Sequence, residues 1–180
     1  MEINVVDPAT FMSGFPSNSE RLSALKEAKF VFPTWNVVKL GTRKEFKREH
    51  KKNGRKITAE AADLLTKPAF TVASEEARIE LVKVRLWDMC FTSASLEEIC
   101  DRAVELGLKP CPAEVGPQVW YQRLNSSDDN GLIIAMKAIV GSDGNPYVFV
   151  VESEYGQTLD VAYASPAGGW SLDDDLILCK

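Results

Sequence analysis

The strongest constraint on the fold is a series of β-prone runs in the last third of the chain. Four such runs occupy residues 131–140, 146–153, 158–165 and 174–180. The first two flank the letters GSDGN, and an Asp-Gly pair between apolar runs is typical of a β-hairpin turn. Strands joined by tight turns pair in the antiparallel sense, so these runs predict a mainly antiparallel sheet.

Helical patterns dominate the earlier part of the chain. Residues 19–30, 43–56 and 58–68 each combine a helix-start signal with an apolar periodicity or a stop signal. The most regular helical pattern covers 95–107, where Ser95 and Glu98 have the spacing of a capping box. Two β-prone runs, 35–41 and 76–87, interrupt these helices. We therefore expect an α+β fold, with a helical N-terminal half packed on a mainly antiparallel sheet formed largely by the C-terminal half.

The organisation of the chain follows from its length and its turn residues. A chain of 180 residues has the size of one ordinary domain, so we expect a single compact domain over 1–180. Residues 1–17 are rich in turn residues, and we expect them to be irregular.

Residues 105–118, with the letters ELGLKPCPAEVGPQ, are the most distinctive segment. Gly107 suits the left-handed end of a helix, and Pro110 and Pro112 prevent that helix from resuming. The next letters, PQVWYQRL, read as a strand over 117–124. The segment is therefore predicted to be a corner between a helix and a strand.

The same segment carries a resemblance to a known family. LGLKPCPAEVGPQ, together with PTWNVVKLGT, LEEICDRAVELGL and GGWSLDDDLILCK in the same order, resembles the signature of a large family of uncharacterised bacterial proteins. The resemblance covers the chain roughly from Ser19 onward. It implies a bacterial origin and one compact unit, and it brings no catalytic or binding residue with it.

The charges are unevenly distributed along the chain. The net charge is -5, but residues 1–70 contain 13 basic and 8 acidic residues, whereas residues 71–180 contain 8 basic and 18 acidic residues. A basic front part and an acidic rear part can serve two partners or attract each other.

The chain shows no sign of export or of membrane insertion. No apolar run is long enough to span a bilayer, and the first residues lack the basic and apolar regions of a signal peptide. The four cysteines form no C-x-x-C pair, which favours free thiols in a reducing compartment. We therefore predict a cytoplasmic protein without a membrane partner.

A basic helix over 43–56 is the strongest candidate binding feature. Cations at this density suit a phosphate backbone or an acidic protein partner, and a solvated helix facing the acidic rear part is the alternative. The eight candidate residues are Arg43, Lys44, Lys47, Arg48, Lys51, Lys52, Arg55 and Lys56.

Catalytic groups are weakly indicated. Cys111 follows a helix C-terminus, which disfavours a thiolate, and the only histidine is His50. Glu114 is the best single carboxylate for a hydrolase, but hydrogen bonds to backbone N–H groups within the corner are the favoured interpretation. Asp173–Asp175 read as the charged start of an edge strand. No spacing predicts a metal site or a cofactor.

These patterns favour a non-enzymatic interaction or accessory module of the bacterial cytosol, with a protein partner. Two alternatives remain open from the sequence. One is a nucleic-acid-binding protein that uses the basic helix 43–56, and the other is a small carboxylate-dependent hydrolase.

Overall fold

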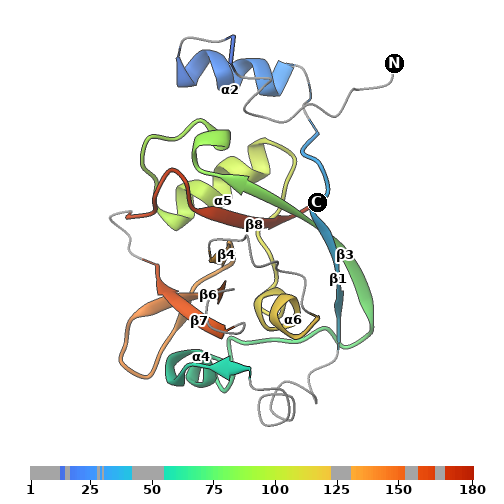
Figure 1. Cartoon of the computed structure of the whole chain (residues 1–180), viewed down its shortest axis with the longest axis vertical. Coiled ribbons are helices and arrows are strands. Elements are labelled where there is room, and N and C mark those ends of the chain that lie inside the picture. Colours follow the sequence, from blue (N-terminus) through green and yellow to red (C-terminus); the bar gives the residue numbers. More distant parts are fainter. Residues whose placement is uncertain are drawn as a thin grey trace.

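The structure of the protein is a computed structural model (Figure 1). It describes residues 13–14, 17–27, 29, 31–41, 55–122, 131–152, 158–164 and 169–180. The helices in these ranges are α2 (Asn18–Glu27), α4 (Ala59–Leu64), α5 (Leu96–Glu105) and α6 (Val115–Gln122), with a short 3₁₀ turn at Trp87–Met89. The strands are β1 (Asn36–Leu40), β2 (Lys56–Ile57), β3 (Ala77–Arg85), β4 (Leu132–Ile134), β5 (Ile139–Val140), β6 (Pro146–Glu152), β7 (Thr158–Tyr163) and β8 (Asp175–Cys179).

The strands form one mixed sheet. Its order is β1-β3-β8-β4-β6-β7-β2, and β5 pairs with β6 outside this path. Two neighbouring pairs, β4 with β8 and β2 with β7, are parallel, whereas the others are antiparallel. The central strand β8 is therefore flanked by β3 from the first half of the chain and by β4 from the second.

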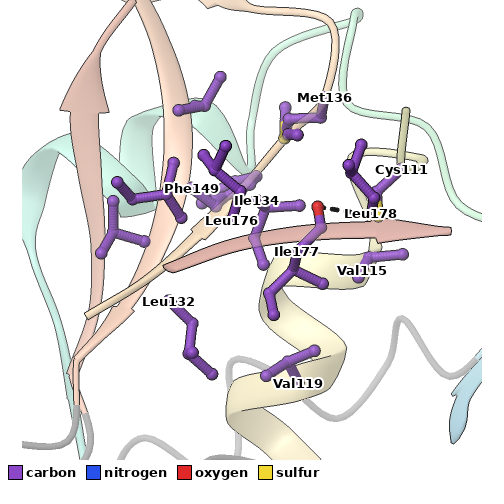
Figure 2. Close-up of a cluster of buried hydrophobic side chains, with 14 of the residues drawn as sticks. Cys111, Val115, Val119, Leu132, Ile134, Met136, Phe149, Leu176, Ile177 and Leu178 are labelled. Carbon is purple, nitrogen blue, oxygen red and sulfur yellow. Dashed lines mark hydrogen bonds between the residues drawn. The ribbon is translucent and has the colours of Figure 1, made fainter. Parts of the chain in front are cut away.

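Helix α6 occupies one face of the sheet. It contacts β1, β6 and β7, and Figure 1 shows it between the β1–β3 end and the β6–β7 end. Val115 and Val119 of α6 point into a buried cluster with Leu132, Ile134 and Phe149 of the sheet (Figure 2). The two ends of the sheet thus share one core around this helix.

Helix α5 and helix α2 follow on the other side of β8. Figure 1 shows α5 and α6 on opposite sides of that strand, and Leu176, Ile177 and Leu178 are accordingly fully buried. The predicted capping box is confirmed, because Ser95 Oγ accepts the N–H of Glu98 and Glu98 Oε2 accepts the N–H of Ser95. Leu25 of α2 packs with Cys90 in a small second cluster.

The predicted division of the chain into a helical half and a sheet half is wrong. An α+β composition is consistent with the structure, but β1, β2 and β3 come from the first 85 residues, whereas α5 and α6 come later. The sheet is mixed, because β4 and β8 run parallel in its centre. Local patterns identified these elements but carried no information about which distant strands pair.

The segment predicted as a strand over 117–124 is helical up to Gln122. Gly116 and Pro117 argued against a helix, and Trp120 and Tyr121 favoured a strand. Pro117 nevertheless lies in the first turn of α6, where a backbone N–H has no intrahelical acceptor, so its missing donor costs nothing. Gly116 is required for a different reason: a Cβ built there would lie 2.6 Å from Cβ of Phe149.

The structure describes only part of two other predicted segments. Of residues 1–17, it places Ser13 and Gly14 in a turn and Ser17 at the start of α2, and the others lie outside the described residues. Of the predicted basic helix 43–56, it describes Arg55 and Lys56, and Lys56 belongs to strand β2 rather than to a helix.

Candidate functional site

The distinctive corner is held by backbone hydrogen bonds to the sheet. Gly107 has a φ of 77°, which ends α5 as predicted, and Leu108 N–H returns to Ala103 O. Lys109 then pairs with Cys179 in an isolated antiparallel bridge, and Cys111 N–H donates to Ala135 O at 2.7 Å. The corner is therefore fixed against the last residues of β8 and the residue after β4.

Glu114 uses both of its carboxylate oxygens to hold distant backbone. Its side chain is buried, and Oε1 accepts the N–H of Gly41 at 2.5 Å while Oε2 accepts the N–H of Ala73 at 2.8 Å. These donors are 73 and 41 residues away in sequence, so the predicted bonds to backbone within the corner are wrong in their location. A carboxylate engaged in this way joins two loops to the start of α6 and is not presented to a substrate.

Two glutamines continue this polar row along α6. Gln118 Nε2 donates to Glu114 Oε1 at 2.9 Å, and Gln118 Oε1 accepts Gln122 Nε2 at 2.8 Å. Gln122 also accepts the N–H of Lys39 and donates to its carbonyl oxygen, at 3.1 and 2.6 Å. Because β1 is an edge strand, this side-chain amide pairs with an edge that would otherwise be open to another strand.

Replacing Gln122 by alanine is expected to lower the free energy of unfolding by about 1 to 2 kcal/mol, because Lys39 loses both partners at a site that solvent still reaches. Urea titration measures this difference. Replacement by glutamate is the matched control: it keeps the acceptor for Lys39 N–H but sets a carboxylate oxygen against Lys39 O and Gln118 Oε1, so no recovery relative to alanine is expected. An alanine variant as stable as the parent would show that the amide contributes nothing to holding β1.

Cys111 is not presented to a substrate as a catalytic nucleophile. It is buried, and burial, together with its hydrogen bond to the neighbouring Cys179, raises its pKa well above the ordinary value. Cys100 also has a raised pKa, of about 11, chiefly because of burial. His50 lies outside the described residues.

The candidate basic residues are only partly placed. Arg43, Lys44, Lys47, Arg48, Lys51 and Lys52 lie outside the described residues, so binding by that segment stays a prediction. Arg55 is 6% exposed, donates through Nη1 to the carbonyl oxygens of Trp120 and Tyr121, and lies over the indole ring of Trp120. Its guanidinium group therefore holds the end of α6, whereas Lys56 is exposed.

The prediction that the acidic run Asp173–Asp175 begins an edge strand is wrong. Asp175 is the first residue of β8 and pairs with Arg85 of β3 and Leu132 of β4, which places it inside the sheet. Asp174 Oδ2 accepts the N–H of Ser171 at 2.7 Å, which closes a turn before the strand. Asp173 is exposed.

A groove of about 470 Å³, here called the outer groove, lies along β4, β6 and β7 and is lined by side chains of the face turned away from α6, together with Val161 and Tyr163 of β7. Ile133 of β4 lies opposite Val150 of β6, so these two side chains share a face of the sheet. On β7, Val150 pairs with Asp160, and the side chain of Ala162, two residues later, lies on that same face. The opposite face carries Ile134 and Phe149, which meet α6 at Gly116. The three outer side chains form an apolar floor for the groove.

Trp170 and two carboxylates complete this outer groove. Trp170 is half-buried and packs against the core, and its Nε1–H, itself buried, has no acceptor within the described part of the chain. The two carboxylates that line the groove belong to Glu152, two positions after Val150 on the same face, and to Asp174 in the turn before β8. The described residues that line the groove include no lysine or arginine. An apolar, aromatic floor with an acidic rim suits a ligand that is apolar along its length and positively charged at its end.

The outer groove has no signature in the sequence. Ile133, Val150 and Ala162 lie in apolar runs that look like ordinary core. The strand register shows that these side chains turn away from α6. Among the described elements, no helix covers that outer face of β4 and β6, so the side chains lie at a groove.

The described residues have neither a metal-binding cluster nor a membrane-spanning helix. They contain no group of three or more His, Cys, Asp or Glu side chains arranged to hold a metal ion. None of the described helices has the length and apolar character needed to cross a bilayer.

Comparison with known proteins adds no relative to this picture. Neither the protein-family models nor the curated proteins nor the solved structures give a match to the chain. The resemblance of the corner segment to a bacterial family therefore stays a prediction.

Proposed function

We propose that the protein is a non-enzymatic interaction module of the bacterial cytosol, and that its outer groove holds a lysine or arginine side chain of a partner protein. The observation that carries this proposal is the composition of the groove: Ile133, Val150 and Trp170 form apolar walls, Glu152 and Asp174 supply negative charge, and no cation stands among the described lining residues.

The chemistry of a long basic side chain fits each part of the outer groove. Its methylene stem can pack on the apolar floor while the charged head remains at the acidic rim. A tryptophan ring adds a cation–π attraction, and carboxylates form charge-assisted hydrogen bonds with ammonium or guanidinium groups.

The charge of the chain supports the same partner. Residues 71–180, which contain every described residue of the groove, hold 8 basic and 18 acidic residues. A cationic partner segment is attracted to such a surface before contact, which raises its association rate.

The test uses an array of twelve-residue peptides with a fixed lysine or arginine at the centre, and the same peptides with glutamine or glutamate there. We expect selective binding of the basic peptides, measured in solution by fluorescence anisotropy. Glu152→Lys is expected to weaken that binding at least about tenfold, because it reverses a charge at the rim. Glu27→Lys changes the net charge equally on exposed helix α2, and it is expected to leave binding unchanged within about twofold.

Three results would contradict the proposal. Equal binding of glutamine- and lysine-centred peptides would show that the groove does not read positive charge. Equal effects of the Glu152 and Glu27 variants would show that only net charge matters. Binding of single-stranded or duplex nucleic acid with a steep salt dependence, unaffected by Glu152→Lys and in the absence of any peptide binding, would instead favour the basic segment 43–56 as the working surface.

A further inference from the structure

Two thiols from distant parts of the sequence meet behind the corner. Cys179 Sγ lies 3.0 Å from Cys111 Sγ, although 68 residues separate them. Figure 2 shows Cys111 beside the β8 segment that contains Ile177 and Leu178, with its thiol directed at the carbonyl oxygen of Ile177 at 3.5 Å.

The backbone around the two thiols is fixed on both sides. Lys109 and Cys179 exchange two hydrogen bonds, at 2.7 and 2.9 Å, and Cys111 is held by Ala135 O. The sulfur atoms therefore lie close because of the fold and not because of a chance side-chain rotamer. A disulfide has a sulfur–sulfur distance of about 2.05 Å, so closing the bond requires a movement of about 1 Å.

We propose that Cys111 and Cys179 are a redox-modification site, at which a low-molecular-weight disulfide converts the two thiols into one intramolecular disulfide. The site is separate from the outer groove, and it does not depend on the proposed function. It joins the corner before α6 to the last residue of the central strand β8.

The electrostatics give the two thiols different roles. The hydrogen bond with Cys111 and, to a smaller extent, the charge of Lys109 lower the pKa of Cys179 against the opposing effect of burial, so we assign Cys179 as the attacking thiol. Burial raises the pKa of Cys111, which is the thiol that resolves the intermediate. Cys179 is the last residue of β8, so access of the small disulfide to its thiol requires opening only the end of that strand, including its two bonds to Lys109.

The exchange balances in two steps. Cys179 thiolate attacks one sulfur of the small disulfide, which forms a mixed disulfide and releases one small thiolate. Cys111 then gives its proton to that released thiolate or to water, and its sulfur attacks Cys179 Sγ, which releases the second small thiolate. The protein loses two thiol hydrogens, and one small disulfide is reduced to two small thiols.

The experiment uses the full chain with Cys90→Ala and Cys100→Ala, so that two thiols remain, and glutathione disulfide as the probe. We expect mass spectrometry to show loss of two hydrogens without retained glutathione, and a peptide map to show Cys111 linked to Cys179. Adding Cys111→Ala is the matched control, and it is expected to trap one glutathione on Cys179. Because the bond closes a 68-residue loop, oxidation is expected to raise Tm by about 5 °C or more, reversibly with dithiothreitol.

Other outcomes would overturn the proposal. Two retained glutathiones would show that the sulfurs do not reach each other, and reaction only in urea would show that the native thiols are inaccessible. A link through Cys90 or Cys100 in the unsubstituted chain would assign the site elsewhere. That last measurement needs no variant, so it decides the question even if the alanine replacements unfold the protein.

Discussion

Replacing Glu114 by alanine is expected to lower the free energy of unfolding by about 3 to 5 kcal/mol. The substitution removes the acceptor for the N–H groups of Gly41 and Ala73 and for Nε2 of the fully buried Gln118. Buried N–H groups have given up their hydrogen bonds to water, and when they lose a charged acceptor this desolvation cost is no longer offset. The missing side chain also leaves a void. Three separate segments lose their common attachment in one substitution.

Urea unfolding followed by circular dichroism measures the effect. Glu114→Gln keeps the volume and one oxygen acceptor but turns an N–H group toward a donor, so we expect it to fall between the parent and the alanine variant. Glu27→Ala, on an exposed surface, is the control for loss of a carboxylate and is expected to change stability by less than about 0.5 kcal/mol. A Glu114→Ala variant as stable as this control would refute the structural role assigned to Glu114.

Replacing Gly116 by alanine is expected to destabilise the protein by about 2 to 4 kcal/mol. The new Cβ would lie 2.6 Å from Cβ and 3.0 Å from Cγ of Phe149. A clash with a Cβ atom cannot be relieved by a different rotamer, so α6 or β6 must move as a whole within a close-packed core. The glycine thus sets the distance between the helix and the sheet.

Thermal and urea unfolding of Gly116→Ala test this expectation. Gly14→Ala is the matched control, because a Cβ there meets no atom within 4 Å. Phe149→Ala in addition to Gly116→Ala should give no recovery, since the opposing Cβ remains. Full stability of the single variant, or full recovery in the double variant, would show that the contact is softer than the backbone positions indicate.

Much of the secondary structure could be predicted from the sequence, because its signals are local. The capping box at Ser95, the glycine stop at Gly107 and the β-prone runs of the last third each became the expected element. Helix α6 was missed, because the contacts that favour it are distant. Glu114 binds Gly41 and Ala73, and Gln122 binds Lys39, so the helix depends on segments that a sequence window does not contain.

The candidate site was less accessible to sequence reasoning than the fold. Asp175 looked like an edge residue and lies in the centre of the sheet, because β8 inserts between β3 and β4. Arg55 looked like part of a cationic surface and is buried against carbonyl oxygens of α6. In both cases the residue type was informative, and the partner that determines its role could be found only from the tertiary arrangement.

The position of β8 has a consequence for biosynthesis. This strand supplies the middle of the sheet, yet Asp175–Cys179 is the last of the eight strands to leave the ribosome. Until it does, β3 and β4 have no common neighbour, and their apolar faces stay exposed to chaperones and to other nascent chains. Ribosome-bound chains that stop before residue 175 are therefore expected to remain protease-sensitive, and native resistance to digestion appears only after this final strand emerges.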